Sequence, residues 1–137
     1  MASKKQVPQQ EDLDKLRSSI MQLVRLHKGN DIMSDWRLVG VAYLVLRHAN
    51  SIVGEKENEE SVETALAEAW QVYTECGGEY AYKSGDPSAR VALTLYNLAE
   101  ESIINTMTKP EFIKSALDRI QKEIDLIKST NKSLLID

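Results

Sequence analysis

Apolar residues recur every three or four positions along most of this chain, which is the spacing of one face of an α-helix. In the segment 10–28 the repeated positions are Leu13, Leu16, Ile20, Leu23 and His27. Asp12 and Asp14 lie in the first turn of this segment and Arg25 and Lys28 in its last, as the helix dipole favours. We therefore expect a helix over residues 10–28 that stops at the Gly-Asn pair 29–30.

The second segment, residues 36–50, is apolar nearly all round, with Arg37 and Gly40 as its main interruptions. Periodicity alone does not separate a buried helix from a buried strand in such a run. We predict a helix, capped by Ser34, because the chain has no second strand-like run with which this one would pair. It would be the central and most buried helix.

A glycine pair, Gly77-Gly78, follows the third stripe, which comes after a charged loop over residues 53–61. The stripe consists of Val62, Leu66, Ala69, Tyr73 and Cys76. A step of four beyond Cys76 reaches Tyr80, an apolar position that keeps the phase of the stripe. Two interior glycines cost about 2 kcal/mol relative to alanine, which packing can offset. We predict one long helix to about residue 83, and we leave open whether the glycines kink it.

The sequence SGDP, residues 84–87, predicts a tight helical hairpin. Gly85 suits the left-handed position at a helix end, Asp86 caps the next helix, and Pro87 fits its first turn. That helix would run to about residue 106. The stretch GGEYAYKSGD resembles the turn region of a tetratricopeptide unit, over roughly one helix-turn-helix. The resemblance implies that Gly78 lets two helices pack closely and that Tyr82 is the helix aromatic, but no repeat accompanies it.

The last helix has the most regular pattern and opens with a T-x-x-E capping box at residues 108–111. Its apolar positions, which we call the seam, are Ile113, Leu117, Ile120, Ile124 and Ile127. The seam either packs into the parent bundle or forms a subunit interface. Four other helices suffice to bury one another, so we predict that the seam carries part of an interface, through self-association or with a partner protein.

These elements predict an all-α protein, a single-domain bundle of about five helices with a long third helix and the hairpin at Gly85 to Pro87. The domain would cover residues 10–129, between a disordered lead (1–9) and a frayed tail (130–137). No apolar run reaches the roughly 20 residues that a membrane span needs. A polar N-terminus without a signal peptide and a single cysteine favour the cytoplasm.

Candidate chemistry is sparse. The run Glu59-Glu60-x-x-Glu63 resembles the Mg²⁺-binding helix of all-α nucleotide pyrophosphohydrolases, which require a second acidic pair on a later helix. In this chain Glu100-Glu101 is followed by isoleucines where that aspartate would stand. The two histidines, His27 and His48, have no metal-ligand spacing, and Cys76 has no activating neighbour. We predict no catalytic residue, no metal and no cofactor.

Charge is unevenly distributed along the chain. Residues 1–50 hold eight Lys and Arg against five Asp and Glu, whereas residues 51–80 hold one lysine against eight glutamates. Contacts to nucleic acid would therefore come from the basic first third, and repulsion from the acidic block opposes them. The basic residues concerned are Lys4, Lys5, Lys15, Arg17, Arg25, Lys28, Arg37 and Arg47.

The aromatic residues stand at helical spacing, where core packing is more common than a ligand-stacking pocket. They are Trp36, Tyr43, Trp70, Tyr73, Tyr80, Tyr82 and Tyr96. We predict a non-enzymatic interaction or assembly module, such as an adaptor, a small regulatory protein or a complex subunit. The alternative is a helical subunit of a nucleoprotein complex, and the third is a metal-dependent nucleotide hydrolase that uses Glu59, Glu60 and Glu63.

Overall fold

The computed structural model describes residues 10–26, 36–50, 59–104 and 109–130, and within these ranges it contains helices and no strands. The six helices are α2 (Gln10–Val24), α3 (Trp36–Asn50), α4 (Glu59–Glu75), α5 (Gly78–Ser84), α6 (Pro87–Ile104) and α7 (Lys109–Thr130). The prediction of an all-α, single-domain bundle is confirmed, with one helix more than expected. The candidate caps at Ser34 and Thr108, the residue His27, the loop 51–58 and the terminal segments 1–9 and 131–137 lie outside the described residues.

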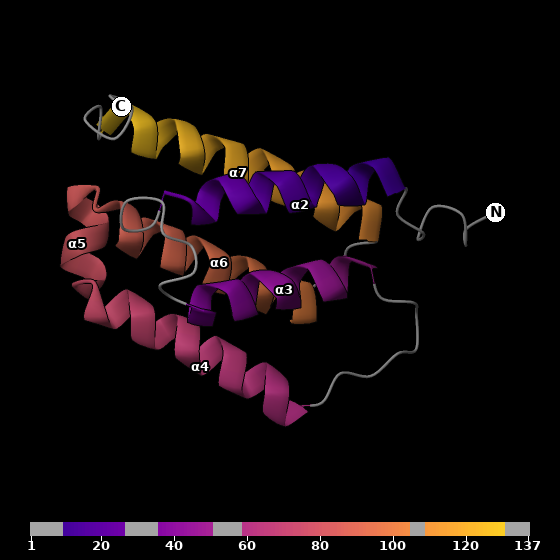
Figure 1. Cartoon of the computed structure of the whole chain (residues 1–137), viewed down its shortest axis with the longest axis horizontal. Coiled ribbons are helices and arrows are strands. Elements are labelled where there is room, and N and C mark those ends of the chain that lie inside the picture. Colours follow the sequence, from indigo (N-terminus) through magenta and orange to yellow (C-terminus); the bar gives the residue numbers. More distant parts are fainter. Residues whose placement is uncertain (1–9, 27–35, 51–58, 105–108, 131–137) are drawn as a thin grey trace.

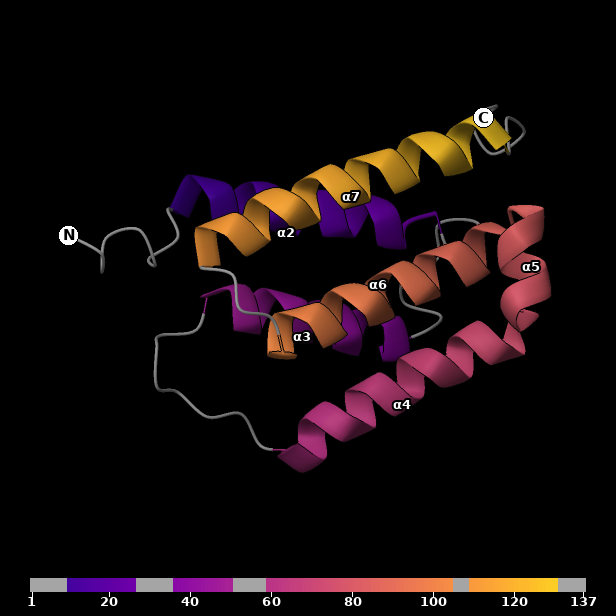
Figure 2. The same cartoon turned by 180° about the vertical axis from the view of Figure 1, so that it is seen from behind.

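The long helices form a bundle that the short helix α5 closes at one end (Figure 1). α2 packs along α7, α3 packs along α6, and α4 lies against both α3 and α6. Seen from behind, α6 runs between α4 and α7 with one side turned outward (Figure 2). We call this side the outward face of α6, because it lies between two flanking helices and opposite the buried contact with α3.

α3 is a helix, as predicted, but it is not buried all round. Leu38, Val41 and Val45 are fully buried, whereas Val39 is 40% exposed and Tyr43 is 63% exposed. These two residues are four positions apart, so they lie on the same open side of the helix. The prediction that α3 is the most buried helix is wrong, because α3 belongs to an outer layer of the bundle (Figure 1).

α6 is the helix that the other elements surround. It packs against α3, α4, α5 and α7. Its apolar residues with 0% exposure are Ala89, Val91, Ala92, Leu95, Leu98 and Ala99. Three of these six side chains are alanines, which allow the neighbouring helices to approach closely, so α6 forms the centre of the core.

The predicted long third helix is broken at the glycine pair. Gly77 has a φ of 116° and Gly78 a φ of 61°, both in the left-handed region that L side chains rarely adopt. The chain turns at Cys76 and Gly77, and α5 then crosses the end of the bundle at a steep angle to α4 (Figure 1). Residues 78–84 are helical as predicted, but Tyr80 is 84% exposed and does not continue the stripe.

The hairpin after α5 is confirmed in each of its parts. Gly85 ends α5 with a φ of 89°, and the backbone N–H of Asp86 donates to the carbonyl oxygen of Ala81 at 2.9 Å. The Asp86 carboxylate accepts a hydrogen bond from the Ala89 N–H at 3.0 Å, which makes Asp86 the N-cap of α6. Pro87 is the first residue of α6.

The tetratricopeptide resemblance does not extend to the packing. A Cβ atom on Gly78 would meet nothing within 4 Å, so Gly78 is not a close-packing position. The close approach occurs at Gly85 instead, where an added Cβ atom would lie 2.7 Å from Cγ2 of Thr130. α5 has only seven residues, because the break at Gly77 removes the first turns that such a unit needs.

The seam of α7 packs within the chain. Ile113, Ile120, Ile124 and Ile127 are at most 2% exposed, and Leu117 is partly buried against the same core. α7 packs against α2, α6 and α3, so its buried side is turned toward these helices. Contact with a second protein through the seam would require α7 to leave the bundle, and the predicted interface stays a prediction.

We predict opposite effects for alanine at two glycines. Gly77→Ala should destabilise the fold by about 1–2 kcal/mol from the left-handed backbone alone. A further cost arises because the added Cβ atom would lie 2.7 Å from Cβ of Ala81. Gly40→Ala should instead stabilise by about 0.5–1 kcal/mol, because Gly40 is helical, exposed and meets nothing within 4 Å. Urea unfolding measures both, and a stabilised Gly77→Ala variant would indicate an uninterrupted helix.

The packing of the seam predicts a contrast between two Ile→Glu variants. Ile120 is 0% exposed, so Ile120→Glu buries a charge, costs several kcal/mol and unfolds the chain at any protein concentration. Ile103 is 39% exposed, so Ile103→Glu should leave the fold intact. Circular dichroism over a concentration series tests the pair. If the Ile120→Glu variant stays folded but has a lower molecular mass in solution than the wild type, the seam forms an interface between chains.

Candidate interaction surface

Three aromatic residues predicted to lie in the core are exposed. Tyr43 is 63% exposed, Trp70 is 48% exposed and Tyr80 is 84% exposed. Tyr73 is buried, and Tyr82 and Tyr96 are partly buried, in agreement with the prediction. The side chain of Trp36 lies outside the described residues. Large aromatic side chains are enriched at protein interfaces, so the surroundings of these three decide whether one of them marks a binding surface.

Trp70 belongs to a row of four aromatic rings that joins three helices. Its ring lies 5.0 Å from that of Tyr73 on α4 and 5.3 Å from that of Tyr96 on α6, centroid to centroid and tilted in both cases. Tyr73 in turn meets the edge of Tyr82 on α5 at 6.5 Å. We call these four residues the aromatic row. Tilted and edge-on rings attract one another, which holds the half-exposed Trp70 in a fixed orientation.

Arg90 connects the end of this row to α7. Its guanidinium lies 4.0 Å from the centroid of the Tyr82 ring and donates to the Tyr82 carbonyl oxygen at 3.0 Å and to the hydroxyl at 3.3 Å. The same guanidinium donates one hydrogen bond to each carboxylate oxygen of Glu123, from Nε and from Nη2. We call the contacts among Tyr82, Arg90 and Glu123 the arginine clamp. They join α5, α6 and α7.

The surroundings of Arg90 in the arginine clamp favour its charged form. Burial by itself lowers the pKa of Arg90, but the hydrogen bonds and the charge of Glu123 outweigh it and raise the pKa above its ordinary value. The side chains of Arg90 and Glu123 are only 14% and 11% exposed. A pair this buried is screened little by salt, and the removal of one partner leaves a buried charge without compensation.

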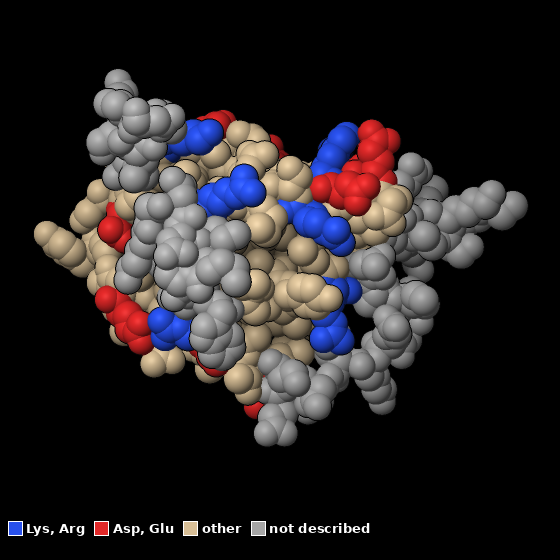
Figure 3. Space-filling view, viewed as in Figure 1, with Lys and Arg blue, Asp and Glu red and all other residues tan. Residues whose placement is uncertain are grey.

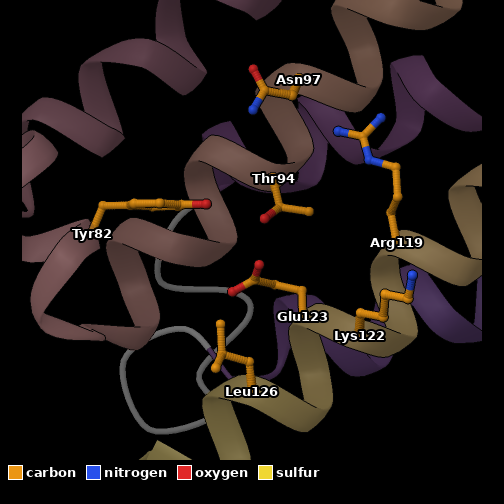
Figure 4. Close-up of a pocket in the computed structure, with 7 residues that line it drawn as sticks. All are labelled: Tyr82, Thr94, Asn97, Arg119, Lys122, Glu123 and Leu126. Atoms are coloured by element: carbon orange, nitrogen blue, oxygen red, sulfur yellow. The ribbon is translucent and has the colours of Figure 1, made fainter.

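A pocket of about 250 Å³ opens beside the arginine clamp, between α5, α6 and α7 (Figure 4). Tyr82 lines it from α5, and Thr94 and Asn97, almost one turn apart, line it from α6. Four residues on one side of α7 complete the wall: Arg119, Lys122, Glu123 and Leu126. The pocket is slightly smaller than a typical site for a small organic ligand.

Trp70 and the pocket lie on opposite flanks of the outward face of α6, and Tyr82 belongs to both the aromatic row and the pocket wall. Tyr96 reaches Trp70 of α4 on one flank, and Thr94 faces α7 on the other. Leu93, which is partly buried, lies on the helix between these two directions. One surface therefore combines an exposed tryptophan, an apolar helix side and a polar pocket, of which Figure 4 shows the pocket.

A second surface lies over α2 and α3 and carries several basic side chains (Figure 3). Arg17 and Met21 on α2, and Arg25 in the turn that follows it, are all exposed and stand four residues apart. Arg17 and Arg25 form no ion pair with the residues that the structure describes, whereas Lys15 pairs with Glu11 at 3.6 Å. Tyr43 of α3 lies in the same outer layer.

Arg37, another residue of the predicted basic face, has a structural partner. It forms a forked ion pair with Glu75 at 3.0 and 3.1 Å, which joins α3 to the end of α4. The residues Lys4, Lys5 and Lys28 of the predicted basic face lie outside the described residues.

The acidic run at the start of α4 gathers no metal-binding cluster that the structure can place. Glu63 is exposed, and the side chains of Glu59 and Glu60 lie outside the described residues. Among the residues that are described, no three His, Cys, Asp or Glu side chains come together as a metal site would need. Glu101 pairs with Arg119 of α7, which gives this carboxylate a structural partner.

His48 and Cys76 also have surroundings typical of structural residues. His48 is 8% exposed, and its Nδ1 lies 3.2 Å from Oγ of Ser102. Because the Ser102 hydroxyl donates to the carbonyl oxygen of Ala99 at 2.7 Å, we assign the proton of the first contact to His48. Cys76 is partly buried against the core at the end of α4.

Comparison of the chain with protein-family models, curated protein sequences and solved structures gave no significant match. None of the described helices is both long and apolar enough to cross a membrane. Neither the aromatic row nor the pocket was predicted from the sequence. The sequence feature that points to the row is the use of aromatic rather than aliphatic residues at helix positions that border the surface, namely Trp70, Tyr73, Tyr82 and Tyr96.

Proposed function

We propose that this chain is a non-enzymatic interaction module that binds a partner protein on the outward face of α6, with Trp70 as the anchor. The observation that carries the proposal is the half-exposed tryptophan, which two neighbouring rings hold in place. Tryptophan, tyrosine and arginine dominate the binding energy of protein interfaces. An anchor that is already ordered also loses little conformational entropy on binding.

The charge around the anchor is consistent with a protein partner. Glu100 accepts a hydrogen bond at 3.5 Å from the hydroxyl of Tyr96, whose ring lies beside Trp70. A carboxylate at this position repels a phosphate backbone. Burial, followed by the charge of Glu100, raises the pKa of Tyr96, so its hydroxyl stays protonated and remains a donor at neutral pH. We place the module in the cytoplasm, where its cysteine stays reduced.

Self-association through α7 is not part of the proposal, because the seam is buried within the chain. Contact with a nucleic-acid backbone through α2 is the second candidate function. The exposed Arg17 and Arg25, which form no ion pair with described residues, favour it. Such binding would weaken steeply with salt concentration, which separates it from contact through Trp70.

We predict that Trp70→Ala abolishes partner binding without unfolding the chain. The substitution should weaken the affinity by about 30-fold or more, since anchor residues contribute about 2 kcal/mol or more. Tyr80→Ala is the matched control, because Tyr80 is an exposed aromatic residue outside the aromatic row. Its affinity should equal that of the wild type.

The experiment has two stages. Affinity capture from the cells that make the protein, with wild type and both variants, identifies proteins that Trp70→Ala loses and Tyr80→Ala retains. Isothermal titration with the purified candidate then measures the three affinities. A partner that binds the Trp70→Ala variant as tightly as the wild type would overturn the proposal.

A further inference from the structure

The Thr94 hydroxyl is buried without a hydrogen-bond partner among the described residues. Thr94 is 8% exposed, and it lines the pocket between α6 and α7. In the close-up its hydroxyl points toward Glu123, into the space that the lining side chains enclose (Figure 4). Buried polar groups in native proteins almost always have a partner, and one without a partner destabilises the fold.

Several other helical hydroxyl groups among the described residues bond to their own backbone. Thr74 donates to the carbonyl oxygen of Trp70 at 3.0 Å, and Ser84 donates to that of Tyr80 at 2.7 Å. This local bond is the usual way to satisfy a threonine or serine within a helix. Thr94 lacks it, so its hydroxyl remains available to a group that enters the pocket.

Most groups of the pocket wall that are not already used in hydrogen bonds within the protein are donors. Both oxygens of Glu123 already accept from Arg90. Arg119 donates from one nitrogen to Glu101 and has further N–H groups, since a guanidinium carries five. Asn97 has no hydrogen bond to the described residues, so its amide is available in addition to the Thr94 hydroxyl.

Lys122 adds a second positive charge at the rim. Its ammonium group pairs with Asp118 at 3.0 Å, but the two side chains are 76% and 64% exposed. An exposed pair of this kind contributes little to stability, so a ligand can compete for the lysine. The pocket therefore offers Arg119 and Lys122 for charge, and Thr94 and Asn97 for hydrogen bonds.

We propose that this pocket binds a carboxylate group. Two acceptor oxygens with a single negative charge match the available donors, and Leu126 and the Tyr82 ring offer apolar contacts to the carbon atoms behind the carboxylate. A phosphate dianion fits less well, because Glu101 already compensates Arg119 and because Glu123 forms part of the wall. The carboxylate belongs either to a small free acid or to an acidic side chain of a bound protein.

The test is a titration followed by amide chemical shifts in two-dimensional NMR spectra. The probes are succinate and the capped amino acids N-acetylglutamate amide and N-acetylglutamine amide. The proposal expects saturable shifts around residues 94–97 and 119–123 with the acid probes and none with the glutamine probe. If only succinate gives saturable shifts, the natural ligand is a small free acid. If the capped glutamate gives saturable shifts, the ligand is an acidic side chain of a bound protein.

Two substitutions connect the binding to the pocket. Thr94→Val preserves the shape and removes the hydroxyl, so it should weaken binding about tenfold while the unfolding temperature stays equal or rises. Thr64→Val on the exposed side of α4 is the matched control and should change neither quantity. Arg119→Gln should weaken binding by a similar factor, and Lys114→Gln, exposed on the same helix, should not.

Two results would overturn the inference. One is a set of chemical-shift changes that grow linearly with the concentration of each acid and also appear with the glutamine probe, because such changes indicate nonspecific contact. The other is an unfolding temperature that falls by several degrees in Thr94→Val, because the hydroxyl would then already have a partner within the protein. The inference does not rest on the proposed function, since neither result decides whether Trp70→Ala weakens the binding of a protein partner.

Discussion

Arg90 holds the short helix α5 against the two long helices that follow it in the chain. Its guanidinium stacks on Tyr82, donates to the Tyr82 carbonyl oxygen and forms a forked pair with Glu123. α5 has seven residues and one buried apolar residue, Ala81, so it cannot be stable by its own packing. The arginine clamp stabilises the packing of α5 against the bundle, as larger apolar faces do for the longer helices.

The position of α5 determines both features of the outward face. Tyr82 forms one end of the aromatic row through its contact with Tyr73, and it also forms one wall of the pocket. A shift of α5 would therefore separate Tyr73 from Tyr82 and open the pocket at the same time. This coupling connects a single buried ion pair to the surface that we propose for binding.

Much of the fold was predictable from the sequence because helical periodicity and capping chemistry act locally. The hairpin at Gly85, Asp86 and Pro87 was predicted residue by residue, since each residue has a strong preference for its position. The break at Gly77 was missed because Tyr80 keeps the apolar phase by coincidence. A glycine is compatible with both a helix and a left-handed turn, and tertiary packing decides between them.

The candidate site was less predictable, because it depends on contacts between residues far apart in the chain. Arg90 and Glu123 are 33 positions apart, and neither belongs to a recognisable motif. The seam of α7 was identified correctly as an apolar stripe, but a stripe does not reveal which surface it meets. The exposed side of α3 was missed for the same reason, since Val39 and Tyr43 resemble core residues in the sequence.

The most direct test of this account is a double-mutant cycle with Arg90→Met, Glu123→Leu and the double variant, measured by urea unfolding. The arginine clamp predicts that each single substitution costs about 3 kcal/mol or more, because it leaves a buried charge without its partner. The double variant should lose far less than the sum, because it leaves neither charge behind. Additive losses, each below about 0.5 kcal/mol as for an exposed pair, would contradict the central role of Arg90.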